Sequence, residues 1–211
     1  MTVARAVRER QIGEVLHFTT NKGLLGILAS RAIKARSRLE SDKMLEFILL
    51  RNAAFRKDQA WLDYVNLSIS RINSQFFSAS GLWHRHRQVW WCVLSLDPVI
   101  LTHPGVVFAT TNNIYPSAER GEGGTSLLRL FSPQVVGRYG SLIRRRDGMP
   151  DCYTTCEQAE VLYPGEVSTE YLRTIYVVQH DDADDVHGQI EAVGHRRVDV
   201  VVHPGKFSSV S

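Results

Sequence analysis

The spacing of apolar and polar residues predicts a strand near the N-terminus that leads into a helix. Glu14 to Thr19 form a short, mainly apolar segment, and positions 19–21 hold residue types that cap helices. Apolar residues on one side of the next segment predict a helix from about Lys22 to Ser30. Positions 34–61 mix charges with scattered apolar residues, and we expect part helix and part loop there.

Strands dominate the remainder of the chain. Val65, Leu67 and Ile69 alternate with polar residues, and positions 89–96 are nearly continuously apolar, which is typical of a buried strand. Further strands are predicted at 106–109, 158–162, 175–178 and 198–202, with a loop at 121–124, a short helix at 125–131, a helical turn at 168–173 and an acidic turn at 181–185. Helices come early and strands come late, so the expected class is α+β, in a single domain over residues 1–211.

Composition narrows the class of protein. Of the 211 residues, 44% are apolar and 22% are charged, the usual mixture in a globular protein. No apolar run approaches the ~20 residues that a membrane span needs, and the charged N-terminus does not resemble a signal peptide. Three cysteines argue against a disulfide scaffold and favour a reducing compartment. We therefore expect a soluble cytoplasmic protein; its net charge of +3 permits a nucleic-acid partner without requiring one.

The segment around Glu160 carries the clearest candidate chemistry. On the strand predicted at 158–162, Gln158 and Glu160 would share one face, while Ala159 and Val161 would point into the core. The carboxylate could grip a ribose hydroxyl and stabilise a cationic sugar, and the carboxamide could pair with a base edge. The alternative is that both side chains belong to the solvated face of an edge strand.

Two other groups could hold a nucleotide. His17 and Thr19 would share a face at the end of the first strand, where they could bind ribose or amide groups; the alternative is a histidine at the edge of the core beside a helix cap. Arg51 and Arg56 precede the strand that begins near Tyr64, and a guanidinium suits a pyrophosphate. The alternative for these arginines is a solvated helix face.

Basic clusters and metal ligands give weaker signals. Arg144, Arg145 and Arg146 are consecutive, and a second cluster spans residues 83–87, so either could contact the phosphates of single-stranded nucleic acid. The histidines at 84 and 86 and the cysteines at 152 and 156 lack a second pair of ligands at zinc-finger spacing, and we expect no metal. Neither GxxxxGK[ST] nor GxGxxG occurs in the chain.

The order of these pieces resembles the DarT family of DNA ADP-ribosyltransferase toxins over about residues 14–178. The matching segments are Leu-His-Phe-Thr at 16–19 with the helix that contains Gly26, Asn-Leu-Ser-Ile-Ser at 66–70 with Asn73, Trp-Cys-Val-Leu-Ser-Leu at 91–96, Phe108 with Asn112 and Asn113, and Gln-Ala-Glu-Val-Leu at 158–162. The last of these, followed by Pro164-Gly165, is the strongest element.

The resemblance implies a split, mostly antiparallel sheet and NAD⁺ as co-substrate. It implies Glu160 and one arginine, Arg56 or Arg51, as catalytic residues. NAD⁺ would be bound by the residues of the first strand and its helix, by the later serine strand and by the same arginine: His17, Phe18, Thr19, Gly26, Ser68 and Arg56. Gln158, Arg144, Arg145 and Arg146 would contact DNA.

The resemblance also implies a reaction and a biological role. The expected activity is mono-ADP-ribosylation of a base in single-stranded DNA by a toxin whose antitoxin is a macrodomain protein or a NADAR-type hydrolase. The Leu-Ser-Ile-Ser strand with Asn73 resembles the guanosine-directed branch, although Asp63-Tyr64-Val65 before it is closer to the thymidine branch. The alternatives are an ADP-ribosyltransferase acting on protein or a small molecule, and a non-catalytic nucleic-acid-binding module.

Overall fold

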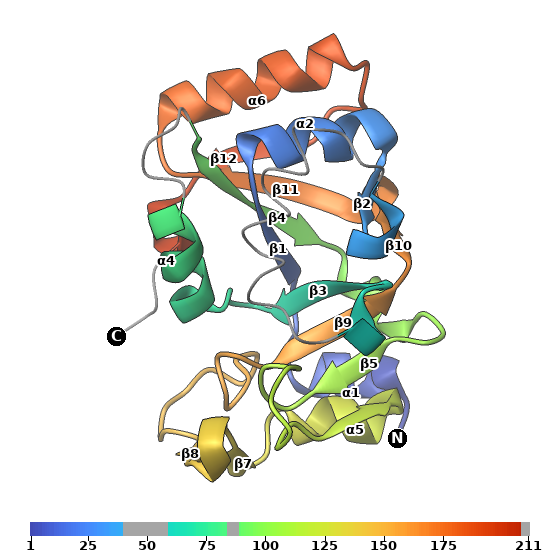
Figure 1. Cartoon of the computed structure of the whole chain (residues 1–211), viewed down its shortest axis with the longest axis vertical. Helices are drawn as coiled ribbons and strands as arrows, with labels where there is room; N and C mark the ends of the chain where they lie inside the picture. The colour runs from blue at the N-terminus through green and yellow to red at the C-terminus, as the bar shows by residue number, and fades with distance from the viewer. Residues whose placement is uncertain (40–58, 84–88, 208–211) are drawn as a thin grey trace.

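The computed structural model describes residues 1–39, 59–83 and 89–207, and the main sheet they form has eight strands (Figure 1). In spatial order these are β12 (Asp199–Val202), β11 (Leu172–Val177), β4 (Trp91–Leu96), β1 (Val15–Thr20), β3 (Tyr64–Ile69), β9 (Glu160–Pro164), β5 (Val107–Ala109) and β6 (Arg120–Glu122). Neighbours pair antiparallel except β11 and β12, which are parallel. The mostly antiparallel α+β prediction is confirmed.

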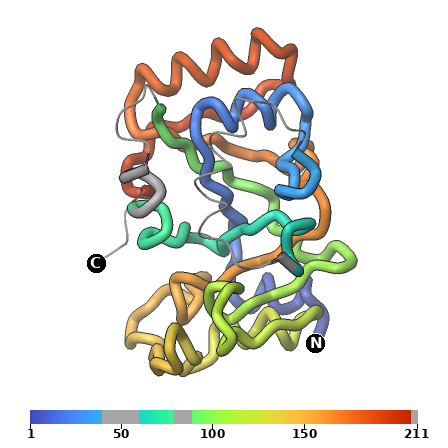
Figure 2. Tube along the Cα trace, viewed as in Figure 1, coloured from blue at the N-terminus to red at the C-terminus, as the bar shows by residue number. Residues whose placement is uncertain are grey.

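The sheet is split between β1 and β3. These strands share only the register pairs Val15–Ile69 and Leu16–Ser68. Beyond them, β1 continues along β4 as far as Thr20, whereas β3 continues along β9 back to Tyr64. The two halves of the sheet therefore diverge from a short common seam, as Figure 2 shows for β1 (blue) and β3 (teal).

Helices cover the two faces of the sheet unequally. The helices α1 (Val3–Glu9), α2 (Asn21–Ser30), α5 (Gly123–Arg129) and α6 (His180–Ala192) bury apolar residues in the larger core, which also holds Val65, Leu67 and Ile69 of β3. The opposite face carries a smaller cluster around Leu16, Ile72 and Val93, covered by α4 (Ser74–Trp83) and the 3-10 turn η6 (Pro204–Phe207). The second face carries Glu160 of the candidate site, whereas His17 and Thr19, which pair with Leu94 and Cys92 of the larger core, lie on the other face.

Smaller elements complete the described chain. Two short strand pairs lie outside the main sheet: β2 (Ala32–Lys34) with β10 (Glu166–Ser168), and β7 (Gln134–Val136) with β8 (Leu142–Arg144). The remaining 3-10 turns are η1 (Arg36–Arg38), η2 (Gln59–Trp61), η3 (Pro98–Thr102), η4 (Arg138–Gly140) and η5 (Thr169–Tyr171). The hairpin of β7, η4 and β8 lies at the opposite end of the molecule from α6 (Figure 1).

The alternation of apolar residues placed most strands correctly. The strands predicted at 14–19, 64–70, 89–96, 106–109, 175–178 and 198–202 are β1, β3, β4, β5, β11 and β12. Thr20 caps α2, since its side chain accepts from the Gly23 N–H at 3.2 Å. The helical turn at 168–173 is η5. Of the segment 34–61, the described residues form η1, η2 and part of β2.

Two predicted connections are wrong. The acidic run 181–185 is not a turn: it lies in the first turns of α6, where Asp181 and Asp182 interact favourably with the helix dipole. The Gly-rich segment 121–124 is not simply a loop, because it ends β6 and begins α5. Gly124 lies in that helix, where a Cβ would approach the Thr2 backbone carbon to 2.6 Å. A close approach of two backbones, rather than flexibility, explains this glycine.

Candidate active site

Glu160 is the first residue of β9 and lies on the sheet face that α4 covers. It pairs in register with Ala109 of β5. Extending the Leu67–Val161 pairing by one residue brings Glu160 opposite Ser68 of β3, and cross-strand partners share a face. Ala159 and Val161 are buried in the larger core, as predicted, while Glu160 is half-buried. The alternation therefore fixes the direction of the carboxylate.

The Glu160 carboxylate is held by the loop between β5 and β6. The backbone N–H of Asn113 donates to Glu160 Oε2 at 2.9 Å. The Asn113 side chain is in turn fixed, because its Oδ1 accepts from Arg120 Nε at 2.6 Å. A fixed N–H donor of this kind holds the carboxylate in one position.

Arg120 organises that loop through backbone carbonyls. Its guanidinium donates to the carbonyls of Ala118 (2.8 Å) and Tyr115 (3.1 Å), and to the carbonyl of Asn113. One planar side chain therefore ties three points of the loop together. The sequence gives no hint of this role, because the glycine-rich context of Arg120 indicates only a turn.

His17 lies at the point where the sheet splits. Its Nδ1 is 3.1 Å from the carbonyl oxygen of Asn66 on β3. The ring therefore bridges β1 and β3 just beyond their last register pair, Leu16–Ser68. This half-buried position connects the two halves of the sheet close to Ser68, the residue opposite Glu160.

Thr19 is packed against the first turn of α2. A Cβ built on Gly23 would lie 2.2 Å from Thr19 Oγ1, so only glycine allows the hydroxyl its present place. The Thr19 carbonyl accepts from the Cys92 thiol at 3.7 Å. Gly26, in contrast, lies on the exposed side of α2, and a Cβ there would meet no atom within 4 Å. Gly23, which no sequence motif indicates, is therefore the glycine that lets α2 approach Thr19 closely.

Phe18 belongs to an aromatic cluster on the face that carries Glu160. Its ring centroid lies 5.4 Å from that of Phe77, 5.8 Å from that of Phe76 and 5.8 Å from that of Trp91. Phe207 of η6 extends the cluster through Phe77, at 5.8 Å. The rings attach α4 and the C-terminal turn to the sheet.

Gln158 lies in a turn and not on the strand, which corrects the prediction of a strand from 158. Thr154 Oγ1 donates to the Cys156 carbonyl at 2.7 Å, and the Ala159 N–H donates to the same carbonyl at 3.1 Å, so the chain folds back before β9 begins. Gln158 Nε2 donates to Gln75 Oε1 on α4 at 3.0 Å. The carboxamide is therefore positioned by α4 and not by the pleat of the sheet.

The same turn is attached to the start of α4. Asn73 Oδ1 accepts from the Phe76 N–H at 3.0 Å and caps the helix, while Glu157 Oε1 accepts from the Ser74 N–H at 2.8 Å. A carboxylate at a helix N-terminus is favoured by the helix dipole. The segment before Glu160 is thereby fixed to α4 at both Glu157 and Gln158.

The three consecutive arginines have different environments. Arg145 is half-buried, and its guanidinium donates to the carbonyls of Tyr153 (2.5 Å), Pro150 (2.7 Å) and Met149 (3.4 Å). Burial, followed by the nearby charge of Arg10, lowers the pKa of Arg145. Arg144 and Arg146 are exposed. Arg145 thus organises the 149–153 segment, and only its two neighbours face solvent.

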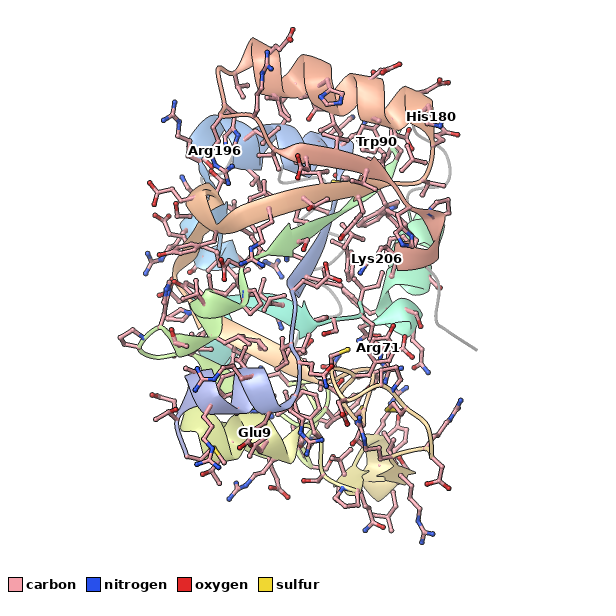
Figure 3. The ribbon with its side chains drawn as sticks, turned by 180° about the vertical axis from the view of Figure 1, so that it is seen from behind. Glu9, Arg71, Trp90, His180, Arg196 and Lys206 are labelled. Atoms are coloured by element: carbon pink, nitrogen blue, oxygen red, sulfur yellow. The ribbon has the colours of Figure 1, made fainter. Side chains whose placement is uncertain are left out.

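Arg71 supports the same segment from the end of β3 and was not singled out by sequence. It donates to the Thr154 carbonyl at 2.8 Å and stacks over the Tyr153 ring, 5.0 Å from its centroid. Figure 3 shows Arg71 where the end of α4 approaches these loops. Ser70 just before it has a positive φ of 58°, an uncommon conformation for serine. The tight bend after β3 therefore turns the Arg71 side chain toward Tyr153 and Thr154.

Several buried polar atoms here have no partner among the described residues. They are Ser70 Oγ, Arg71 Nε and Asn113 Nδ2. Such atoms carry a free-energy cost unless something hydrogen-bonds to them. Together with Glu160 and Ser68, they supply the donors, hydroxyls and carboxylate that ribose and amide groups need. The residues present therefore fit a nucleotide such as NAD⁺.

Some predicted residues lie outside the described residues. These are Arg51, Arg56 and the histidines and arginines of the 84–87 cluster. Within the described part of the chain, no three residues of the His, Cys, Asp and Glu types gather in a way that could hold a metal ion. No helix in that part is long and apolar enough to span a membrane.

Comparisons with known proteins agree with the overall fold. Comparison with curated protein sequences gives no match. Among solved structures, the Thermus sp. 2.9 DarT in complex with ADP-ribosylated ssDNA aligns with a TM-score of 0.70 at 16% identity, covering 94% of this chain and 97% of that chain. The complex of the same protein with NAD⁺ gives a TM-score of 0.67 at 16% identity, covering 94% and 98%.

A third structure and a family model extend the comparison. Thermosipho africanus DarTG in complex with ADP-ribose gives a TM-score of 0.58 at 13% identity and covers 92% of this chain and 51% of that chain. The family model described as "DarT: ssDNA thymidine ADP-ribosyltransferase, DarT" matches residues 16–208. Because this match takes in most of the sequence, the chain belongs to the DarT family of NAD-dependent single-stranded DNA ADP-ribosyltransferases.

Proposed function

We propose that this protein transfers ADP-ribose from NAD⁺ to a base in single-stranded DNA, with Glu160 as the catalytic carboxylate. The observation that carries the proposal is the position of Glu160: a half-buried carboxylate, held by the Asn113 N–H at 2.9 Å and opposite Ser68 on a split sheet. NAD⁺ supplies the ADP-ribosyl group and a good leaving group, nicotinamide. Glu160 accepts a hydrogen bond from a ribose hydroxyl and stabilises positive charge on the sugar.

Residues on both sides of the split bind the co-substrate. His17, Phe18 and Thr19 contribute from β1 and Ser68 from β3, and α2, the helix that contains Gly26, contributes through the close approach of Gly23 to Thr19. An arginine from the segment before β3, Arg56 or Arg51, neutralises the pyrophosphate and acts beside Glu160 in the transfer. The unpartnered Nδ2 of Asn113 supports this assignment, since the residue that carries it is hydrogen-bonded to Glu160 and offers a further donor beside the carboxylate.

The segment that precedes Glu160 presents the base. Gln158 lies two residues before the carboxylate, and its Nε2 donates to Gln75 Oε1 on α4. This bond fixes the carboxamide, and its Oε1 and second amide hydrogen would pair with a base edge. Arg144 and Arg146 contact phosphates, and Arg145 contributes by shaping the 149–153 segment. A base must be unstacked to react, which costs least in a single strand.

Guanosine is the acceptor that we favour. The Asn-Leu-Ser-Ile-Ser sequence of β3 and the following bend, together with Asn73, support this choice. Asn73 caps α4 through its side chain and so shapes the part of the site next to Gln158. Thymidine, which the description of the family model names, is the alternative acceptor.

The biological role that we propose is that of a cytoplasmic toxin with a cognate antitoxin. A modified base on single-stranded DNA would block its use as a template, so a cell needs an enzyme that removes the adduct. The antitoxin would be a macrodomain protein or a NADAR-type hydrolase. Both classes would act on the ADP-ribosylated base and need not touch this protein.

The experiment is an incubation of the protein with NAD⁺ and oligonucleotides that each lack one base, followed by mass spectrometry. We expect the mass of one ADP-ribose on every single strand except the one without guanine. Labelling only of the strands that contain thymine would reassign the acceptor. Nicotinamide release that does not depend on DNA would favour an enzyme acting on protein or a small molecule. Absence of any NAD⁺ thermal shift would favour a non-catalytic binding module.

A further inference from the structure

We propose that the β7–β8 hairpin is a stacking platform for nucleotides that flank the target base, with Tyr139 as the principal stacking residue. The platform consists of Tyr115, Arg138 and Tyr139. It deepens the proposed function, on which it rests, by naming the surface that would read the single strand beyond the reacting base.

Tyr139 is exposed to an unusual degree. Its side chain is 89% exposed, and every other large apolar residue recorded as exposed in the described chain is at most 56% exposed. Two of those others, Leu142 at 56% and Ile114 at 42%, lie on the same hairpin and on the Asn113 loop. A ring that stays in water gains no burial free energy on folding, and a ligand that covers it would supply that free energy on binding.

The backbone conformation of Tyr139 carries a free-energy cost. The residue has a φ of 56°, in the left-handed region that glycine or asparagine adopts more readily. The fold of the turn does not depend on a tyrosine at this position, since the ring does not pack into the core. A side chain that is both exposed and conformationally strained is characteristic of a binding position.

Arg138 connects Tyr139 to the candidate active site. Its guanidinium carbon lies 4.6 Å from the Tyr139 ring centroid and 6.0 Å from that of Tyr115. Tyr115 is two residues from Asn113, whose N–H holds Glu160, and the Tyr115 carbonyl accepts from Arg120. An unbroken series of contacts therefore runs from the catalytic carboxylate to the tip of the hairpin.

The hairpin is also fixed to that loop. Ser117 Oγ donates to the Gly137 carbonyl at 2.8 Å, and Gly137 N–H donates to the Ser141 carbonyl at 2.7 Å inside the hairpin. The platform therefore keeps its position relative to Asn113, which lies four residues before Ser117. Figure 1 shows β7 and β8 on the same end of the molecule as β5 and the strand that begins with Glu160.

The positive charge of the hairpin favours single-stranded nucleic acid, rather than a protein, as its binding partner. Between residues 134 and 146 the chain carries Arg138, Arg144, Arg145 and Arg146 and no acidic residue. Exposed aromatic rings stack on unpaired bases, while neighbouring guanidinium groups contact the phosphates. A duplex would not offer its base faces in this way.

The test measures the affinity of the protein for a fluorescent single-stranded oligonucleotide in the absence of NAD⁺. Tyr139→Gly removes the ring and suits the positive φ, so we expect an equal or higher melting temperature and an affinity about tenfold lower. Tyr139→Phe should keep the affinity of the wild type, because the ring remains. Leu25→Ala, at an exposed apolar residue of α2, is the matched control and should change nothing.

The salt dependence separates stacking from charge. Tyr139→Gly should lower affinity by the same factor at every salt concentration, whereas Arg138→Gln should reduce the slope of log affinity against log salt. In the presence of NAD⁺, Tyr139→Gly should raise KM for a long oligonucleotide and leave kcat unchanged.

The failures of the platform and of the proposed function are distinguishable. If the wild type modifies DNA and Tyr139→Gly binds the oligonucleotide as tightly as the wild type, the platform is refuted. If the wild type modifies no oligonucleotide, the proposed function fails, whatever the variants bind.

Discussion

The backbone N–H of Asn113 and the carboxylate of Glu160 lie 2.9 Å apart and join two parts of the chain that are 47 residues distant. This hydrogen bond links the β5–β6 loop to the first residue of β9. The carboxylate therefore depends on the loop for its position, and the loop depends on Arg120. Residues that never touch a substrate should consequently affect the reaction through Glu160.

Replacing Arg120 should disturb this arrangement. Arg120→Lys cannot serve the carbonyls of Asn113, Tyr115 and Ala118 together, and we expect the protein to lose about 2 kcal/mol of stability. A loosened loop should lower kcat roughly 10- to 100-fold. Urea denaturation and transfer rates would measure both.

Arg129→Lys is the control for Arg120. This arginine is exposed, and its guanidinium is 3.7 Å from Glu119, a pair worth at most about 1 kcal/mol. A loss of activity in Arg129→Lys equal to that in Arg120→Lys would show that the hydrogen bonds of Arg120 to the loop carbonyls have no specific effect on the reaction.

Gly23 and Gly26 should respond in opposite ways to alanine. In Gly23→Ala the new Cβ would lie 2.2 Å from Thr19 Oγ1, so the hydroxyl must rotate away and the thermal shift caused by NAD⁺ should shrink. Gly26→Ala adds a methyl group to open space in a helix and should stabilise the protein by ~0.5–1 kcal/mol with the NAD⁺ shift unchanged. Equal NAD⁺ shifts in the two variants would show that Thr19 is not part of the nucleotide site.

The fold was largely predictable because burial on one face of a strand imposes a strict alternation. Val65, Leu67 and Ile69 are buried, as that rule predicts, and so are Ala159 and Val161 around Glu160. The alternation of buried and exposed residues does not show where a strand begins or ends. Gln158 was assigned to β9 although hydrogen bonds around Cys156 make it part of a turn.

The site was only partly predictable, since several of its determinants are contacts between distant segments. Arg120 gathers loop carbonyls, Arg71 reaches the Thr154 carbonyl 83 residues away, and Gly23 matters only because Thr19 lies against it. No periodic pattern in the sequence predicts such contacts. Conversely, the acidic run at 181–185 is easily mistaken for a loop, because the helix dipole makes acidic residues favourable at the start of α6.

Gln158 should separate transfer to DNA from hydrolysis of NAD⁺. Gln158→Ala removes the amide that we expect to pair with the base, while Glu160 and its support by Asn113 remain. DNA modification should then fall strongly, and slow release of nicotinamide without DNA should persist. Gln179→Ala, at an exposed glutamine just before α6 and away from the hairpin, is the matched control. A proportional loss of both rates would assign Gln158 to the NAD⁺ site or to the support of the turn.

The three cysteines should differ in reactivity. Burial raises the pKa of the Cys92 and Cys156 thiols, and a raised pKa lowers the thiolate fraction at a given pH. Cys152 is partly exposed. At about pH 8, a thiol reagent should therefore label one cysteine per folded chain and all three after unfolding. Rapid labelling of Cys156 in the folded protein would contradict the packing around β9.

The most direct measurement compares the wild type with Glu160→Gln on one guanine-containing single strand. The substitution keeps the size of the side chain and removes its charge, so the fold and NAD⁺ binding should remain, as melting temperature and NAD⁺ thermal shift would show. We predict that the rate at which the oligonucleotide gains ADP-ribose falls by ~10²–10³ or more. A rate within tenfold of the wild type, in a folded variant that binds NAD⁺, would show that Glu160 is not the catalytic carboxylate.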